Sequence, residues 1–347
     1  MGSAPREADP YDSQSAAMAR EEIPLRALIV HNPRSGFGSD AIFQFERALL
    51  QAGDECVMRV LTDDFVAREA VSDAAGFDVV VLSGGDGTIS SLLYELRDLS
   101  VPVCAFPSGT ANLLCSNLGN APEPFALARA CRIGKTAALD LGEISWASDD
   151  GEEHTTGFAL MSGTGFDAQL MQAALPNKAI MGQAAYFAAA LANPRPTVAR
   201  FSITVDGETH EREGITCLVA NTATIQGDIQ IIPDCRMDDG LLDVIVVETS
   251  DAAQLLKPLA VGLLDRSGHA VGRPHIESFR GREIKIVSSV PVPLEVDGDV
   301  APGLVSSYEA RVLPRAAQLV VDPMSPYGTA DDGSSRFGGS DVIAYPK

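Results

Sequence analysis

Hydrophobic positions in the first part of the chain form short, nearly continuous runs that alternate with helix-like segments. The runs are typical of strands buried on both faces, and they cover 25–32, 56–62, 77–83 and 101–110. Between them lie segments with apolar residues at helical spacing, at 39–53, 63–76, 89–99 and 111–119. Ser39 or Asp40 is the candidate cap of the first helix, and Gly53 ends it. The alternation predicts a parallel sheet with helices on both faces.

After about Leu139 the pattern changes to strand-like runs separated by turn signals. These runs cover 201–211, 214–222, 241–250, 283–289, 292–300 and 308–314, and only 178–193 and 252–266 have a clear helical pattern. We therefore predict an α/β domain over 25–138 and a mostly antiparallel β domain over 139–323. We predict a disordered arm over 1–24 and a flexible tail over 324–347.

Composition narrows the class of protein. The chain has 347 residues, 46% of them hydrophobic and 21% charged, as in a globular protein. Its net charge of −21 argues against nucleic acid as a partner. Six cysteines without a C-x-x-C pair, and five histidines without zinc spacing, argue against a zinc enzyme. We see neither a secretory signal nor a transmembrane run, so we expect a cytoplasmic protein.

The stretch Val81–Ser91, VLSGGDGTISS, ends a predicted strand with a cluster of glycines. Glycines at such a turn let the backbone take positive φ and let a phosphate approach the amides. The start of the next helix adds free N–H groups and the positive end of its dipole. Asp86 is negative, so it suits a metal ion or a hydroxyl beside the phosphates better than the phosphates themselves. The glycines alone favour a tight turn between strand and helix, because a single glycine-rich loop is weak evidence for a phosphate site.

Two more loops of this kind strengthen the case for a phosphate site. His31–Gly36 (HNPRSG) and Phe106–Leu114 (FPSGTANLL) also follow predicted strands and precede predicted helices. The carboxyl ends of neighbouring parallel strands meet at one edge of the sheet, where ligands of such sheets bind. Neither G-x-G-x-x-G nor G-x-x-x-x-G-K-[ST] occurs, which excludes the dinucleotide fingerprint and the P-loop.

The three loops, read as N-P-x-S-G, G-G-D-G-T and P-x-G-T-x-N, resemble the catalytic domain of the diacylglycerol kinase and sphingosine kinase superfamily. The bacterial soluble lipid kinases of that group are the most similar. Gly163–Ala168 (GTGFDA), Ile232–Val244 (IPDCRMDDGLLDV) and Leu294–Asp299 (LEVDGD) continue the resemblance in the family's order. It covers roughly 25–322. It implies an α/β nucleotide domain over a β-sandwich, with ATP and a lipid meeting in the cleft between them.

The resemblance also implies roles for particular residues. Contacts to ATP would come from Asn32, Pro33, Arg34, Ser35, Gly36, Thr62, Gly84, Gly85, Asp86, Gly87, Thr88, Ile89, Ser90, Thr110 and Asn112. A structural Mg²⁺ would be held by Arg236, Asp239 and Leu241 in the DDG turn. Asp86, Asp297 and Asp299 would be the catalytic residues.

This chain departs from the family at two of these motifs. Many members have Asp where Leu113 follows Asn112, and many read D-G-E where this chain has Asp297-Gly298-Asp299. If 296–299 is extended, Asp297 and Asp299 share a face and could raise one another's pKa, as a proton acceptor needs. An Asp-Gly turn with both acids in water is the structural alternative. We favour Asp297 as the acceptor. Asp206 belongs to a second D-G-E, which we predict to be a hairpin turn.

The leading hypothesis is ATP- and Mg²⁺-dependent phosphorylation of a lipid hydroxyl, on a diacylglycerol, a sphingoid base or a ceramide. The enzyme would meet its substrate transiently at a membrane surface, and a homodimer is compatible with the sequence. An NAD kinase shares G-G-D-G-T, but its expected Asn-Glu pair does not occur in this chain. The third hypothesis is a regulator that binds nucleotide or lipid without catalysis.

Overall fold

The computed structural model describes residues 23–35, 40–148, 151–165, 196–225, 229–250, 265–269 and 272–327. The predicted arm and tail lie almost wholly outside these ranges. The predicted helix 178–193, Gly36, Ser39 and the last three residues of GTGFDA also lie outside them, as does 252–266 apart from its last two residues.

The N-terminal half alternates strands and helices as predicted. Its elements are β1 (Arg26–His31), α1 (Ala41–Gln51), β2 (Glu55–Val60), α2 (Ala67–Ala70), a 3-10 turn (Ala74–Gly76), β3 (Val79–Gly84), α3 (Asp86–Glu95), β4 (Val103–Pro107), α4 (Leu113–Asn117) and α5 (Pro124–Ile133). The strands pair in parallel in the order β2-β1-β3-β4. Helices α1 and α5 pack on one face and α3 on the other, each over its own buried core.

Two local helix predictions in this half need correction. The segment 63–76 is not one helix, because α2 stops after four residues. The Ser72 hydroxyl donates to the Glu69 carbonyl at 3.0 Å, a local bond that competes with helix continuation. Conversely, α5 is not predicted by the alternation. It begins with Pro124 after Glu123, whose carboxylate accepts from the Ala126 amide at 2.8 Å.

The C-terminal half is a sandwich of two mostly antiparallel sheets. Its strands are β5 (Thr136–Ala147), β6 (Glu153–Phe158), β7 (Met161–Gly165), β8 (Ala199–Val205), β9 (Glu208–Gly214), β10 (Thr216–Ala220), β11 (Thr224–Ile225), β12 (Ile229–Gln230), β13 (Leu242–Val247), β14 (Ile276–Gly281), β15 (Glu283–Val292), β16 (Leu294–Val296), β17 (Asp299–Val300) and β18 (Val305–Val320). Side chains from both sheets, including Phe158, Phe201, Leu242 and Leu294, form the core. The predicted fold class is therefore confirmed.

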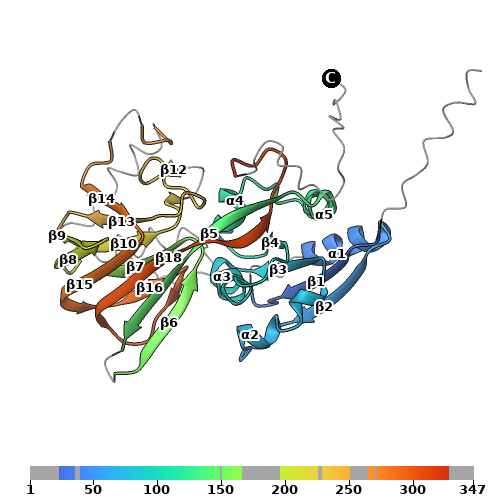
Figure 1. Ribbon diagram of the computed structural model, residues 1–347, viewed down its shortest axis with the longest axis horizontal. Coiled ribbons are helices and arrows are strands. Elements are labelled where there is room, and N and C mark those ends of the chain that lie inside the picture. The colour runs from blue at the N-terminus through green and yellow to red at the C-terminus, as the bar shows by residue number, and fades with distance from the viewer. Residues whose placement is uncertain are drawn as a thin grey trace, which may run out of the picture.

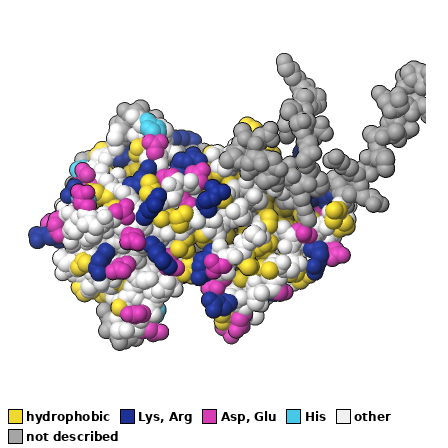
Figure 2. Space-filling view, in the orientation of Figure 1, with side chains coloured by type: hydrophobic (Ala, Val, Ile, Leu, Met, Phe, Trp, Pro, Cys, Tyr) yellow, Lys and Arg dark blue, Asp and Glu magenta, His cyan; other side chains and the backbone are white. Residues whose placement is uncertain are grey.

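A continuous sheet joins the two halves (Figure 1). The long strand β18 pairs with β5, β15 and, through Leu319 beside Val103, with β4. Leu319 and Val320, at the end of β18, are buried in the two N-terminal cores. The predicted division at 138/139 falls within β5 and stays a prediction. Figure 2 shows acidic and basic side chains interspersed over the C-terminal half, with a notch between the halves on the same face.

The turn at Asp206 and Gly207 joins β8 to β9 as a tight hairpin. Both residues have positive φ, 49° and 89°, as a two-residue turn of this hand requires. The Asp206 carboxylate accepts from the amides of Arg282 and Glu283, each at 2.9 Å. The prediction that this D-G-E is a turn is confirmed.

Candidate active site

The loops after β1, β3 and β4 meet at one edge of the parallel sheet, as the sequence predicts. The Gly85 amide donates to the Ser35 hydroxyl at 2.9 Å, and the Asn32 side chain donates to the Thr88 hydroxyl at 2.9 Å. Gly109 lies so close that a Cβ there would be 2.7 Å from the Gly85 Cα. Glycine is therefore required where the two loops touch.

A chain of polar side chains runs beneath these loops. His31 Nδ1 lies 2.9 Å from the Ser83 hydroxyl, which lies 2.7 Å from the Ser108 hydroxyl. Burial lowers the pKa of His31, which favours its neutral form. These hydrogen-bonded side chains connect the end of β1, the end of β3 and the loop after β4. They therefore hold the three loops in place relative to one another.

The first turn of α3 faces this edge. Gly85 is its N-cap residue in an extended conformation and supplies no side-chain cap. Amides of a first helical turn have no carbonyl partner within the helix, so this end suits an anion. Ile89 and Ser90 are buried further along the same helix, with 3% exposure each. Their buried side chains therefore fix the start of α3, and with it the glycine loop that precedes the helix.

The Asp86 carboxylate is directed at the next helix. It accepts from the amides of Leu113 and Leu114, at 3.2 and 3.1 Å, and so caps the N-terminus of α4. Asn112 has a φ of 51°, and its side chain closes a loop on both backbone groups of Gly109. In this arrangement Asp86, which follows β3, holds the loop after β4 against the loop after β3.

The remaining predicted nucleotide residues lie around this centre. The exposed Arg34 side chain pairs with Asp63 at 2.9 Å, and the Arg34 amide donates to Asn32 at 3.0 Å. Thr62 donates to the Asp64 carboxylate at 2.9 Å. Pro33 is exposed next to Arg34, whereas Thr110 is half-buried in the turn before α4. The loop after β2 therefore lies beside the loop after β1.

Asp297 and Gly298 form a two-residue turn between β16 and β17. Val296 pairs with Asp299 across the turn, and Asp297 and Gly298 have φ of 46° and 89°. The expectation that 296–299 is extended, with both acids on one face, is therefore wrong. An Asp-Gly pair in a two-residue hairpin favours this backbone over an extended strand.

The Asp297 carboxylate is buried in a cage of amides. It accepts from the backbone of Ala159 at 2.6 Å, Leu160 at 3.1 Å and Met161 at 2.8 Å. The pKa of Asp297 is raised to about 6: burial is the main cause and the charge of Asp86 adds to it, while Ser90 and the amides of Ala159 and Met161 oppose the rise. The Ser90 hydroxyl is buried and makes no hydrogen bond of regular geometry.

Asp299 is exposed and touches the first turn of α3. A Cβ on Gly87 would lie 2.3 Å from Asp299 Oδ2 and 3.3 Å from the Asp297 carbonyl oxygen. A side chain at this position would therefore push the Asp299 carboxylate away from α3. The structure thus brings the exposed carboxylate of Asp299 beside the glycine loop and buries that of Asp297 behind it.

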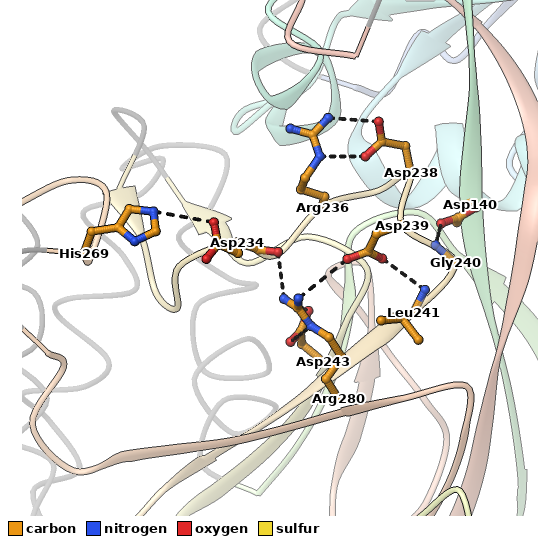
Figure 3. Close-up of polar contacts among 10 residues, drawn as sticks. All are labelled: Asp140, Asp234, Arg236, Asp238, Asp239, Gly240, Leu241, Asp243, His269 and Arg280. Carbon is orange, nitrogen blue, oxygen red and sulfur yellow. Dashed lines mark hydrogen bonds and ion pairs between the residues drawn. The ribbon is translucent and has the colours of Figure 1, made fainter.

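The predicted metal residues lie in the turn before β13 (Figure 3). Gly240 has a φ of 73°, and the Asp239 carboxylate accepts from the Leu241 amide at 3.0 Å and lies 3.8 Å from Arg280. Burial raises the pKa of Asp239, and the charges of Asp243 and Asp140 add to this effect. A cation would relieve this repulsion.

Side-chain ion pairs surround the turn. Arg236 pairs with Asp238 through two bonds of 2.7 and 2.9 Å, and Arg280 pairs with Asp243 through two bonds of 2.8 and 3.1 Å. Within the described ranges, no group of three His, Cys, Asp or Glu side chains could hold a metal. A cation here would need Asp239 together with carbonyl oxygens, a donor set that fits Mg²⁺.

Asp140 is a buried acid that the sequence analysis does not single out. Its carboxylate accepts from the amides of Gly240 and Arg315, both at 2.7 Å, and so joins the DDG turn to a bulge in β18. Burial is the main cause that raises the pKa of Asp140. In the sequence, Asp140 is an acid within the apolar run of β5, and this placement could have indicated a buried carboxylate with polar partners.

Comparison with known proteins agrees with this architecture. The model of the diacylglycerol kinase catalytic domain matches residues 26–144, and that of the YegS C-terminal NAD kinase beta sandwich-like domain matches 161–321. The diacylglycerol kinase of Bacillus subtilis (strain 168) is 27% identical over 286 residues, which are 79% of this chain and 89% of the relative. That of Mycobacterium tuberculosis (strain ATCC 25618 / H37Rv) is 28% identical over 313 residues, 88% and 98% of the two chains.

A crystal structure of a diacylglycerol kinase from Bacillus anthracis str. Sterne has the same fold, with a TM-score of 0.67 and 21% identity over 86% of this chain and 97% of that one. The matched regions and the curated relatives define a kinase with an α/β half and a β-sandwich half. The chain belongs to the family of bacterial diacylglycerol-kinase-type lipid kinases.

The buried Asp297 generates a prediction on the pH dependence of stability. The pKa of Asp297 rises from 3.8 to about 6 on folding, so the folded state binds this proton more tightly. The free energy of unfolding should therefore fall as pH rises through this window, by at most about 1.4 kcal/mol per pH unit. Asp297→Asn lacks this ionisation. Urea unfolding of both proteins across the window should show wild type losing stability relative to the variant as pH rises. Parallel pH profiles would contradict it.

Proposed function

We propose that the protein transfers the γ-phosphoryl group of ATP to the hydroxyl of a membrane lipid, with diacylglycerol as the first candidate. The observation that carries this proposal is the contact of the Asp297–Asp299 hairpin with Gly87, which sets a carboxylate beside an anion-binding helix start. The names of the curated relatives favour diacylglycerol over sphingoid bases and ceramide.

The phosphates would lie on the Gly84–Thr88 loop. Its glycines present amides without Cβ atoms, and the α3 N-terminus adds its dipole. The hydroxyls of Ser35, Thr88 and Thr110 and the Asn32 side chain border the loop as further polar groups. Phosphoryl transfer depends mainly on positioning and charge neutralisation, which a rigid, donor-rich loop of this kind supplies.

Asp299 would accept the proton of the lipid hydroxyl. The lipid oxygen attacks the γ-phosphorus, the bond from that phosphorus to the β–γ bridging oxygen breaks, and the proton passes to the carboxylate. Asp297 suits this role less well, although we favour it from sequence, because backbone amides engage both of its oxygens. Asp297 would instead hold the hairpin, and with it Asp299, against α3.

Magnesium fits in two capacities. Asp239, with the carbonyl oxygens of Arg236 and Leu241, would hold a structural Mg²⁺ in the DDG turn. Mg²⁺ carried with ATP neutralises charge on the phosphates. Asp86 already caps α4 with its carboxylate, so its direct contribution to the site is to position the loop before that helix.

The membrane is the expected place of reaction, because the proposed substrate resides there. Among the described residues, no helix is long and apolar enough to cross a bilayer. We propose a cytoplasmic enzyme that contacts the surface of the membrane transiently.

The experiment that tests this function compares acceptors. The purified protein is given radiolabelled ATP and Mg²⁺ with mixed micelles of diacylglycerol, sphingosine or ceramide, and separately with NAD. We expect labelled phosphatidic acid. Labelled NADP instead would indicate the NAD kinase alternative, and nucleotide binding without any product would indicate the regulator.

Asp299→Asn should lower kcat by about two orders of magnitude or more, because a positioned base contributes on this scale. ATP affinity, measured by calorimetry, should change little. The matched control is Glu208→Gln, since Glu208 follows the Asp206–Gly207 turn as Asp299 follows Asp297–Gly298. If Asp297→Asn keeps its melting temperature and loses kcat while Asp299→Asn does not, Asp297 is the acceptor.

Asp239→Ala should abolish the rise in melting temperature that MgCl₂ produces in the wild type, because a ligand that binds only the folded state stabilises it. The Mg²⁺-dependent shift is compared, not the absolute melting temperature, since removing Asp239 also removes repulsion with Asp243 and Asp140. Asp238→Ala, whose wild-type carboxylate pairs with Arg236, should keep the shift. A full shift in Asp239→Ala would exclude this turn as the metal site.

A further inference from the structure

A surface cavity of about 370 Å³ lies where the segment after α3 meets the bulge of β18. It is formed by residues of 97–102, by residues of 315–318 and by Thr136 of β5. Helix α3 has ten residues, so about 15 Å of helix separate this cavity from the glycine loop. Sites for small molecules have volumes of about 300–1,000 Å³. The cavity is therefore large enough for a small ligand and is distinct from the candidate active site.

Arg315 reaches the cavity from an unusual backbone position. Its φ is 53°, a left-handed value that residues other than glycine seldom adopt. Pro314 has no N–H to donate, and the pairing of β18 with β5 shifts register between Leu313 and Ala317. The Arg315 amide instead donates to the buried Asp140 carboxylate at 2.7 Å. A bulge can redirect a side chain, and this one places the exposed Arg315 at the cavity.

Arg97 lines the cavity from the end of α3. Its guanidinium stacks on the Tyr94 ring, with Cζ 4.0 Å from the ring centroid, and donates to the Tyr94 carbonyl at 2.6 Å. The stacking and the bond hold the planar group in one orientation, and the group retains further N–H donors. A side chain that is already held loses little freedom when it binds a ligand. Arg97 is therefore a pre-oriented donor at the cavity wall.

The two arginines give the cavity a net positive lining. Among the described residues, no carboxylate forms an ion pair with Arg97 or Arg315. Glu143 of the neighbouring strand is engaged by Arg311 at 2.6 Å. Asp98 also lines the cavity, which leaves two positive charges and one negative charge. In a chain with a net charge of −21, such a cavity is a place where an anion is attracted.

The lining suits a phosphate monoester better than a carboxylate. The planar fork of a guanidinium matches phosphate oxygens with paired hydrogen bonds, and a phosphate monoester carries nearly two negative charges at pH 7. A carboxylate has two oxygens and one charge, so it would fully engage only one of the two arginines. Ser100, Thr136 and Gln318 add neutral polar groups, while Leu99 and Pro102 provide an apolar wall for the organic part of the ligand.

We propose that this cavity binds a phosphate monoester, with the phosphate group between Arg97 and Arg315. The inference does not depend on the proposed kinase activity. Arg97 belongs to the N-terminal half and Arg315 to the strand that joins the two halves, so the bound phosphate would strengthen the contact between them. The ligand should therefore raise the melting temperature. A soluble metabolite and the headgroup of phosphatidic acid both offer this chemistry.

Calorimetry with glycerol 3-phosphate tests the site. A non-hydrolysable ATP analogue and Mg²⁺ are present throughout, because the glycine loop is itself an expected anion site. We expect the wild type to bind glycerol 3-phosphate but not glycerol. Arg315→Gln should bind at least about tenfold more weakly, because charge-assisted bonds are lost. Its melting temperature without ligand should be unchanged, since the side chain is exposed and the amide that bonds Asp140 remains.

Two further variants sharpen the test. Arg47→Gln removes an exposed arginine of α1 and makes the same change in net charge, so it is the matched control and should bind as the wild type does. Asp98→Asn removes the acid of the lining and should bind up to about fivefold more tightly. A general effect of net charge would weaken binding equally in Arg47→Gln and Arg315→Gln, and that result would overturn the proposal.

Vesicles distinguish the two sources of the phosphate. Phosphatidylcholine vesicles with and without phosphatidic acid are sedimented with each protein. Retention that requires phosphatidic acid and is lost in Arg315→Gln supports the proposal with a lipid headgroup as the ligand. Binding of glycerol 3-phosphate alone supports it with a soluble metabolite. A wild type that binds neither probe at millimolar concentration overturns it, as does equal binding by the wild type and Arg315→Gln. None of these measurements requires phosphoryl transfer, so a failed kinase assay leaves them unaffected.

Discussion

One face of α3 carries the contact between the two halves on which the candidate site depends. Gly87, Ser90 and Tyr94 are spaced three and four residues apart, so they share this face. Gly87 meets Asp299, and Ser90 lies beside Asp297. At the far end, Tyr94 packs on Gly157 of β6, where a Cβ would lie 2.2 Å from the ring, and its hydroxyl donates to Glu143 at 2.5 Å. The helix that presents the glycine loop is thus the same helix that fixes the sandwich.

The two acids of the hairpin differ in burial. Asp297 loses water, gains three amides and has a raised pKa, whereas Asp299 stays exposed next to α3. The turn at Asp206 and Gly207 has the same two-residue geometry, but its carboxylate engages the amides of a neighbouring strand at the surface. The surroundings of an Asp-Gly turn, and not the dipeptide, decide what its carboxylates can do.

Local pattern in the sequence was enough to predict the parallel sheet and the meeting of its three loops. Buried parallel strands read as apolar runs, and glycines mark their ends. The features that sequence reasoning missed depend on contacts far along the chain. Asp297 is caged by amides of 159–161, and Asp140 joins a turn at Gly240 to a bulge at Arg315. No local pattern in the sequence predicts which amides will surround a carboxylate. Nor does any local pattern predict that β18 pairs with the N-terminal sheet.

The candidate site requires close contact between Gly87 and the hairpin, so Gly87→Ala is the most direct test. The added Cβ would lie 2.3 Å from Asp299 Oδ2 and 3.3 Å from the Asp297 carbonyl oxygen, so it must displace the Asp299 carboxylate from its place beside α3. Gly76→Ala is the matched control, because a Cβ there meets no atom within 4 Å. Lipid phosphorylation should fall at least about a hundredfold in Gly87→Ala, on the scale of losing a positioned base, while circular dichroism remains that of the wild type. Wild-type activity in Gly87→Ala would contradict the account.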